Sequence, residues 1–112
     1  MAKLDSEIQA FVAEHPTGWS HADWEQLLAG LSARKVNVPD HDQLGVRLEA
    51  ERLRHSLLAS RVPGLGPKRV DAIVERFGSV QNLRSASPDD VARIPTIPRR
   101  MAEATLAQLS LR

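Results

Sequence analysis

The fold is decided by VPGLGPKRVDAIVERF, residues 62–77, and by its counterpart IPTIPRRMAEATLAQL, residues 94–109. Each stretch has an apolar residue, a tight turn that contains proline, basic residues and then an apolar pattern of helical period. We interpret the two stretches as an internal repeat. Between them, Gly78 predicts a helix stop, and the segment SPDD at 87–90 predicts a helix start with proline at the first helical position. The predicted order is helix, hairpin, helix, short connector, helix, hairpin, helix.

The turn in the first stretch predicts an anion site. Gly64 and Gly66 are able to adopt backbone angles that are closed to other residues, so a phosphate can approach the main-chain amides directly. Leu65 between them is expected to point inward as an anchor. The following helix offers its positive dipole end, and Lys68 and Arg69 add full charges at the same place. Because such contacts reach phosphates and not base edges, they position a protein on DNA without specifying sequence.

The sequence resembles the tandem helix-hairpin-helix family, most closely the tandem domain at the C-terminus of the bacterial excision-repair nuclease subunit UvrC. The basis is VPGLGPKRVDAIVERFGSVQNLRSASPDDVARIP, residues 62–95. The resemblance implies that hairpin amides and nearby basic residues bind DNA backbone phosphates, in repair or recombination, and that paired hairpins straddle the minor groove of a duplex or a duplex junction. The DNA-binding residues that it implies are Gly64, Leu65, Gly66, Lys68, Arg69, Thr96, Ile97, Arg99 and Arg100.

The second hairpin departs from the family pattern. Thr96 and Pro98 stand where the family usually has glycine, or serine at the second place. Proline has no N–H to donate, and a β-branched residue resists a positive φ. Two interpretations stay open: this hairpin grips phosphate more weakly through Arg99 and Arg100, or it only completes the core.

The N-terminal part predicts two further helices, over about residues 5–14 and 20–33, and a longer helix over about 40–60. We expect one all-α protein with a single core, in which residues 1–40 are an N-terminal helical extension and residues 41–112 are the tandem helix-hairpin-helix domain. The predicted buried face of the long helix consists of Leu44, Leu48, Leu57 and Leu58.

The charge is divided unevenly along the chain. Residues 1–60 hold six Lys or Arg and nine Asp or Glu, whereas residues 61–112 hold nine and five, so the two parts carry −3 and +4. The basic C-terminal part favours a polyanionic partner. There is no cysteine, which excludes disulfides and thiolate zinc sites, and there is no apolar run of membrane-spanning length. We expect a cytoplasmic protein without a cofactor, a metal site or a membrane association.

Other candidate sites are weaker. The polar residues His15, His21, Asp23, His41 and Asp42 lack the spacing of metal ligands and suit solvated helix ends better. Trp24 shares an apolar stripe with leucines, which favours core packing, whereas the role of Trp19 stays open.

The sequence contains no reactive constellation, so we expect a non-catalytic DNA-binding module whose partner is a nuclease, a helicase or another repair protein. The alternative is a protein-protein interaction module that uses the tandem hairpins as a packing or dimerisation surface.

Overall fold

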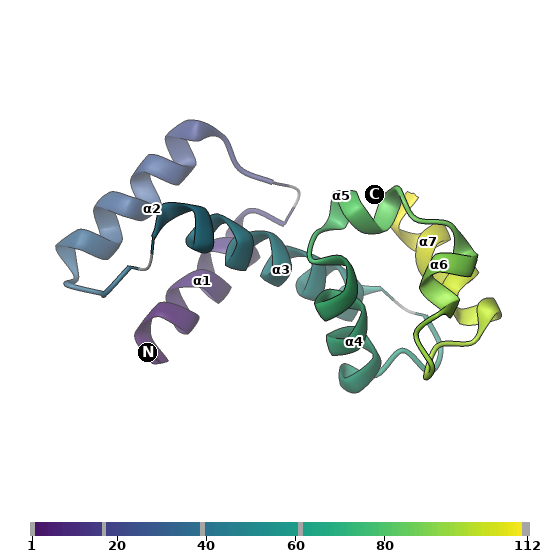
Figure 1. The fold of residues 1–112 in the computed structure, drawn as a ribbon. Coiled ribbons are helices and arrows are strands. Elements are labelled where there is room, and N and C mark those ends of the chain that lie inside the picture. Colours follow the sequence, from purple (N-terminus) through teal and green to yellow (C-terminus); the bar gives the residue numbers. More distant parts are fainter. Residues whose placement is uncertain (1, 17, 39, 61, 111–112) are drawn as a thin grey trace.

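The computed structural model describes residues 2–16, 18–38, 40–60 and 62–110, which contain seven helices and no strand (Figure 1). The predicted all-α fold is therefore confirmed. None of these helices is long and apolar enough to cross a membrane. The helices are α1 (Ala2–Glu14), α2 (His21–Ala33), α3 (His41–Ala59), α4 (Pro67–Phe77), α5 (Val80–Arg84), α6 (Pro88–Ala92) and α7 (Arg99–Ser110).

The helix boundaries follow local capping chemistry. The hydroxyl of Ser20 accepts the Asp23 amide at 3.1 Å, and the Asp23 carboxylate accepts the Ser20 amide at 2.9 Å, which is a complete capping box. Ser87 and Asp90 repeat this arrangement at α6. Gly78 ends α4 in the left-handed region at φ 77°, where glycine has no steric cost. The predicted starts of α2 and α6 and the predicted stop of α4 are thus confirmed.

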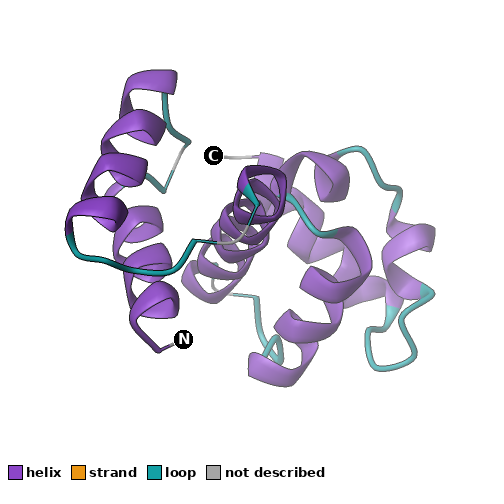
Figure 2. Cartoon of the chain, turned by 60° about the vertical axis from the view of Figure 1, so that its left-hand side comes forward, coloured by secondary structure: helices purple, strands orange, loops and turns teal. Residues whose placement is uncertain are grey.

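The described residues bury two clusters of apolar side chains, so the expectation of a single core was wrong. The first half of α3 packs with α1 and α2, and its second half packs with α4 to α7 (Figures 1 and 2). Leu44 and Leu48 belong to the N-terminal cluster, whereas Leu53 and Leu57 belong to the C-terminal cluster. The boundary expected at residue 40 coincides with the start of α3, a helix that both clusters share.

The reason for two clusters is the length of α3. A helix of 19 residues is about 28 Å long, so its two ends lie far enough apart to pack against different helices. The molecule measures 46 × 25 × 22 Å and has a radius of gyration of 14.9 Å, against about 13 Å for a compact chain of this size. We call the two parts the N-terminal lobe (α1, α2 and the first half of α3) and the C-terminal lobe (the second half of α3 and α4 to α7).

Two details of the expected helices differ from the structure. Leu58 is 51% exposed, and Leu53 is fully buried in its place. Adjacent helical residues point about 100° apart, so only Leu57 of the pair faces the core, and Leu53 lies one turn earlier on that face. The connector after α4, expected as a short turn, contains the one-turn helix α5, whose Ser79 side chain accepts the Asn82 amide at 3.1 Å.

Candidate nucleic-acid interface

The first hairpin, residues 62–66, is a tight turn fixed by its own backbone. The Leu65 amide donates to the Val62 carbonyl at 3.1 Å, and the Gly66 amide donates to the Gly64 carbonyl at 3.0 Å. Gly64 has a φ of +82°, a conformation that glycine adopts without strain. Leu65 is half-buried against the C-terminal cluster, as expected of an anchor. Gly66 differs from the expectation, because its φ of −87° is open to any residue.

Gly66 matters because it has no side chain. It is the N-cap of α4, and it brings no side chain to cap the first amides of the helix. Pro67 follows and has no N–H, so the amides of Lys68 and Arg69 are the first-turn donors left for an outside acceptor. An added Cβ at Gly66 would meet nothing within 4 Å, so the space beside this N-cap is open.

The four other helices with described N-caps begin differently. Each starts at a serine or aspartate whose side chain accepts a backbone amide of the first turn. The start of α4 is the exception, and it carries Lys68 and Arg69 instead of an acidic residue. Open amides, the positive end of the helix dipole and a full positive charge therefore meet at one place, and this combination suits an anion.

The second hairpin repeats part of this backbone. The Ile97 amide donates to the Ile94 carbonyl at 3.0 Å, and the Ala102 amide donates to the Pro98 carbonyl at 3.0 Å. These bonds match those from Leu65 and Val70 in the first hairpin. Among the described residues other than glycine, Lys35 alone has a positive φ, so Thr96 does not adopt the angle of Gly64. Pro98 also lacks the amide that Gly66 has.

Arg69 connects the two hairpins. Its Nη1 donates to the Gly64 carbonyl at 2.7 Å, and its Nε donates to the Thr96 carbonyl at 2.7 Å. Gly64 and Thr96 occupy the same place in VPGLGP and IPTIPR, so one guanidinium holds equivalent carbonyls of both repeats. The side chain that sequence reasoning assigned to phosphate thus has protein acceptors.

The basic residues of the second hairpin are not alike. Arg99 pairs with the carboxylate of Asp89 and also donates from Nε to Glu103 Oε1 at 3.1 Å. These contacts raise the pKa of Arg99, the hydrogen bond to Glu103 most of all, and they offset its positive charge. The i,i+4 spacing of Arg99 and Glu103 indicates this pair in the sequence, whereas no local spacing indicates the contact between Arg99 and Asp89.

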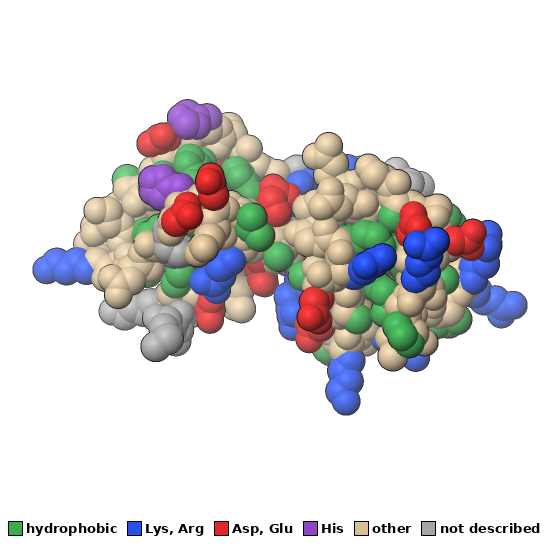
Figure 3. All heavy atoms as spheres, in the orientation of Figure 1, with side chains coloured by type: hydrophobic (Ala, Val, Ile, Leu, Met, Phe, Trp, Pro, Cys, Tyr) green, Lys and Arg blue, Asp and Glu red, His purple; other side chains and the backbone are tan. Residues whose placement is uncertain are grey.

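Lys68 and Arg100 are the predicted cations that remain available. Both are exposed, and within the part of the chain that the structure describes neither takes part in an ion pair. Each is the second residue of its helix, and they occupy equivalent positions in the two repeats. Lys and Arg side chains gather on the C-terminal lobe in Figure 3, where several of them project from its rim.

A groove of about 690 Å³ lies where the two hairpins meet. Its lining comes from the first hairpin, from the first turns of α4 and from the second hairpin. The residues that line it are Gly64, Gly66, Pro67, Lys68, Arg69, Ala72 and Thr96. Five of the predicted site residues are therefore brought together here, whereas Ile97 is buried in the core and Arg99 is engaged with carboxylates. Met101, which sequence reasoning missed, packs beside Gly64: its Cε would lie 2.9 Å from a Cβ at that position.

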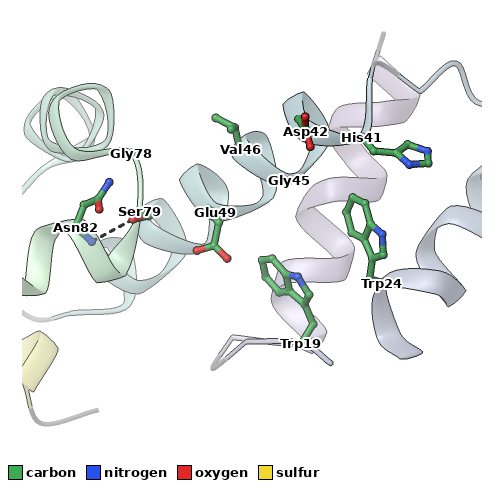
Figure 4. A pocket seen from close by; sticks show the side chains of 10 residues that line it. All are labelled: Trp19, Trp24, His41, Asp42, Gly45, Val46, Glu49, Gly78, Ser79 and Asn82. Atoms are coloured by element: carbon green, nitrogen blue, oxygen red, sulfur yellow. Dashed lines mark hydrogen bonds between the residues drawn. The ribbon is translucent and has the colours of Figure 1, made fainter. Parts of the chain in front are cut away.

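A second groove, of about 670 Å³, lies between the lobes and is shown in Figure 4. Trp19 and Trp24 form one side, Val46 and Glu49 of α3 form the middle, and Asn82 of α5 lies at the other end. The lining contains no Lys or Arg side chain. This groove is therefore unsuited to a polyanion.

The histidine and aspartate at the ends of α1 and α2, His15 and Asp23, have local partners. His15 Nδ1 donates to the Phe11 carbonyl at 2.9 Å, and His15 Nε2 lies 3.6 Å from the Asp23 carboxylate. Hydrogen bonds from Ser20, its backbone amide first, lower the pKa of Asp23. Among the residues that the structure describes, no three His, Asp or Glu side chains are grouped as metal ligands.

Comparison with known proteins places the hairpins in context. Residues 56–109 match the family described as SAM-like helix-hairpin-helix tandem. UvrABC system protein C from Beutenbergia cavernae is 49% identical over 49 residues, which are 44% of this chain and 7% of that protein. The same protein from Desulfatibacillum aliphaticivorans is 43% identical over 60 residues, which are 54% of this chain and 10% of that protein. The chain thus spans at most a tenth of these relatives. No solved structure matches significantly.

Proposed function

We propose that this chain binds DNA through backbone phosphates, without reading its sequence. The proposal is supported by the match of residues 56–109 to the tandem helix-hairpin-helix family and by the similarity of part of the chain to UvrABC system protein C. The observation that carries this proposal is the uncapped start of α4. It combines amides without a side-chain cap with the exposed Lys68, which has no ion pair among the described residues, at a groove between two hairpins. A phosphate oxygen there accepts from the Lys68 and Arg69 amides while the Lys68 ammonium neutralises its charge.

The second hairpin would contribute mainly charge. Its turn lacks the glycine conformation and one amide, so we assign its part of the grip to Arg100, the counterpart of Lys68. Two hairpins that each meet one strand would straddle the minor groove, which is about 6 Å wide in B-form DNA. This arrangement favours a duplex or a duplex junction over a free single strand.

We assign the chain a non-catalytic part in DNA repair or recombination. Phosphate contacts position a protein on DNA, and the described residues of both hairpins supply donors and cations rather than a nucleophile or a base. In this proposal any cleavage or unwinding belongs to a partner nuclease or helicase, which the module would hold on the DNA.

The test is a fluorescence-anisotropy titration of duplex, junction and single-stranded DNA of unrelated sequences at two salt concentrations. With about two phosphates neutralised, the slope of log K against log salt should be near −2. Lys68→Glu and Arg100→Glu should each weaken binding about ten-fold or more, with an unchanged circular dichroism spectrum. Lys35→Glu is the matched control, because it changes the net charge equally on the other lobe. No binding of any DNA at low salt would contradict the proposal, as would equal losses for all three variants.

The groove of Figure 4 favours a second candidate function, the binding of a protein partner. Val46, which lines the groove, is 67% exposed, and Gly45 lies in a helix interior, where glycine costs about 1 kcal/mol relative to alanine. A Cβ at Gly45 would meet nothing within 4 Å, so the chain itself does not require this glycine. With Asp42 and Glu49 beside the two indoles, the groove suits a segment that carries apolar side chains next to a lysine or arginine.

Intrinsic fluorescence tests this second function directly, because the chain has two tryptophans and both line the groove. The probes are an amphipathic leucine-lysine peptide and the same peptide with glutamate in place of lysine. The lysine peptide alone should shift the emission and saturate, and Val46→Glu should abolish the shift. Equal responses to both peptides would contradict the proposal.

A further inference from the structure

We infer that the side chain of Arg69 is a positioning group that fixes the distance between the two hairpins, and that only the backbone amide of Arg69 serves phosphate; this inference rests on the proposed function. A guanidinium is planar and offers five donors in a fixed geometry, so it can hold two acceptors at a set spacing. Arg69 does this with the carbonyls of Gly64 and Thr96, each at 2.7 Å.

The positions of these carbonyls give the contact its meaning. Gly64 and Thr96 are equivalent residues of the two repeats, and each directly precedes the apolar residue that anchors its hairpin, Leu65 or Ile97. The bridge therefore joins the two turns at corresponding points of their backbones. Lys68 and Arg100, four residues beyond each carbonyl, are carried on helices that start directly after these turns.

Packing beside Gly64 supports the same role. The repeat places Met101 where the first repeat has Arg69, and its Cε lies against Gly64. Arg69 thus reaches from the first repeat to the second, and Met101 reaches from the second repeat to the first. Met101 contributes an apolar contact without direction, whereas Arg69 contributes two directed hydrogen bonds.

Fixed spacing matters for a duplex and not for a single strand. The two strands across a minor groove stand at a set separation, so both hairpins engage only if their own separation matches it. A flexible single strand adapts to either spacing. Arg69 should therefore govern the preference for duplex over single-stranded DNA, and Lys68 should govern the affinity for both.

The first experiment measures the spacing itself. The chain has no cysteine, so Lys68→Cys with Arg100→Cys provides the sites for two spin labels at exposed, equivalent positions. Distances between the labels are measured by double electron-electron resonance in three proteins, one with Arg69 intact and two with a substitution. Arg69→Lys keeps the positive charge but loses the planar guanidinium that reaches two carbonyls. Arg69→Met introduces the residue that stands at the equivalent position of the second repeat. Both variants should broaden or shift the distance distribution while circular dichroism shows a folded protein. An unchanged distribution would overturn the bridge.

The second experiment measures binding in the chain without cysteines. Arg69→Lys should lower the ratio of duplex to single-strand affinity about ten-fold, whereas Lys68→Ala should weaken both and leave the ratio within about two-fold. A changed distance distribution with an unchanged ratio would overturn the positioning role. If the wild-type chain binds no DNA, the proposed function fails, and the distance measurement still decides whether Arg69 sets the hairpin spacing.

Discussion

Substitution of Gly66 by aspartate should make the protein more stable and a weaker DNA binder. Gly66 has the extended backbone of an N-cap, φ −87° and ψ 178°, and a Cβ there meets no other atom within 4 Å. An aspartate would cap the open amides of α4 and complement the helix dipole, which together contribute about 0.5–1 kcal/mol. For a chain of this size the gain corresponds to a rise in Tm of about 2–5 °C.

The same carboxylate would occupy the amides that we assign to phosphate. Hydrogen bonds to charged groups contribute about 1.5–3 kcal/mol each, so losing one of them should raise Kd about ten- to a hundred-fold. Differential scanning calorimetry measures the first effect, and anisotropy titration of a duplex at low salt measures the second. If the single new carboxylate raises both Tm and Kd, the weaker binding cannot come from a folding defect.

Two controls make this prediction sharp. Gly66→Asn caps the amides without a charge and should lie between the wild type and Gly66→Asp in affinity. Ser79→Asp adds a carboxylate at the N-cap of α5, which serine already caps, and should change Kd less than about two-fold in moderate salt. A higher Tm with an unchanged Kd for Gly66→Asp would refute phosphate binding at the start of α4.

Three further outcomes follow from the structure. Gly64→Ala should lower the free energy of unfolding in urea by about 1–2 kcal/mol, because residue 64 has a φ of +82°, which alanine adopts only with strain. An unchanged urea midpoint would contradict this left-handed conformation at residue 64. Leu48→Ala should cost about 2–5 kcal/mol and lower the midpoint followed by tryptophan fluorescence, because both indoles pack against the N-terminal cluster; no shift would argue against that cluster. Serine hydrogen bonds lower the pKa values of Asp23 and Asp90, so their stabilisation is complete above about pH 4 and is lost as the pH falls through the lowered values. The double asparagine variant at these positions should show a flatter Tm profile between about pH 5 and pH 2, and an equally steep profile would contradict the assignment.

The structure divides the basic residues that the resemblance implies into two kinds, according to whether they have partners within the protein. Lys68 and Arg100 are exposed and have no ion pair with any residue that the structure describes, as a phosphate ligand should be. Arg69 and Arg99 carry the same charge in the same motif, yet one holds backbone carbonyls and the other holds carboxylates. A motif specifies residue types, but the acceptors that lie within reach of a long side chain depend on the surrounding fold.

Local features were determined by the sequence alone. The capping boxes at Ser20 and Ser87, the left-handed stop at Gly78 and the repeat of two hairpins all depend on residues within about four positions of each other, where backbone geometry leaves few choices. Helical periodicity likewise predicted the all-α class, because apolar side chains that recur every 3.6 residues lie on one face of an α-helix, where they can be buried together.

The way in which these pieces meet depends on tertiary contacts. The split of buried residues along α3 depends on which helices pack against each half, and the choice of Leu53 over Leu58 depends on the direction from which they approach. The bridge from Arg69 to Thr96 joins residues far apart in the chain. Such contacts follow from helix crossing and side-chain reach, which no local pattern encodes, and they separate the exposed cations Lys68 and Arg100 from the cations that have partners within the protein.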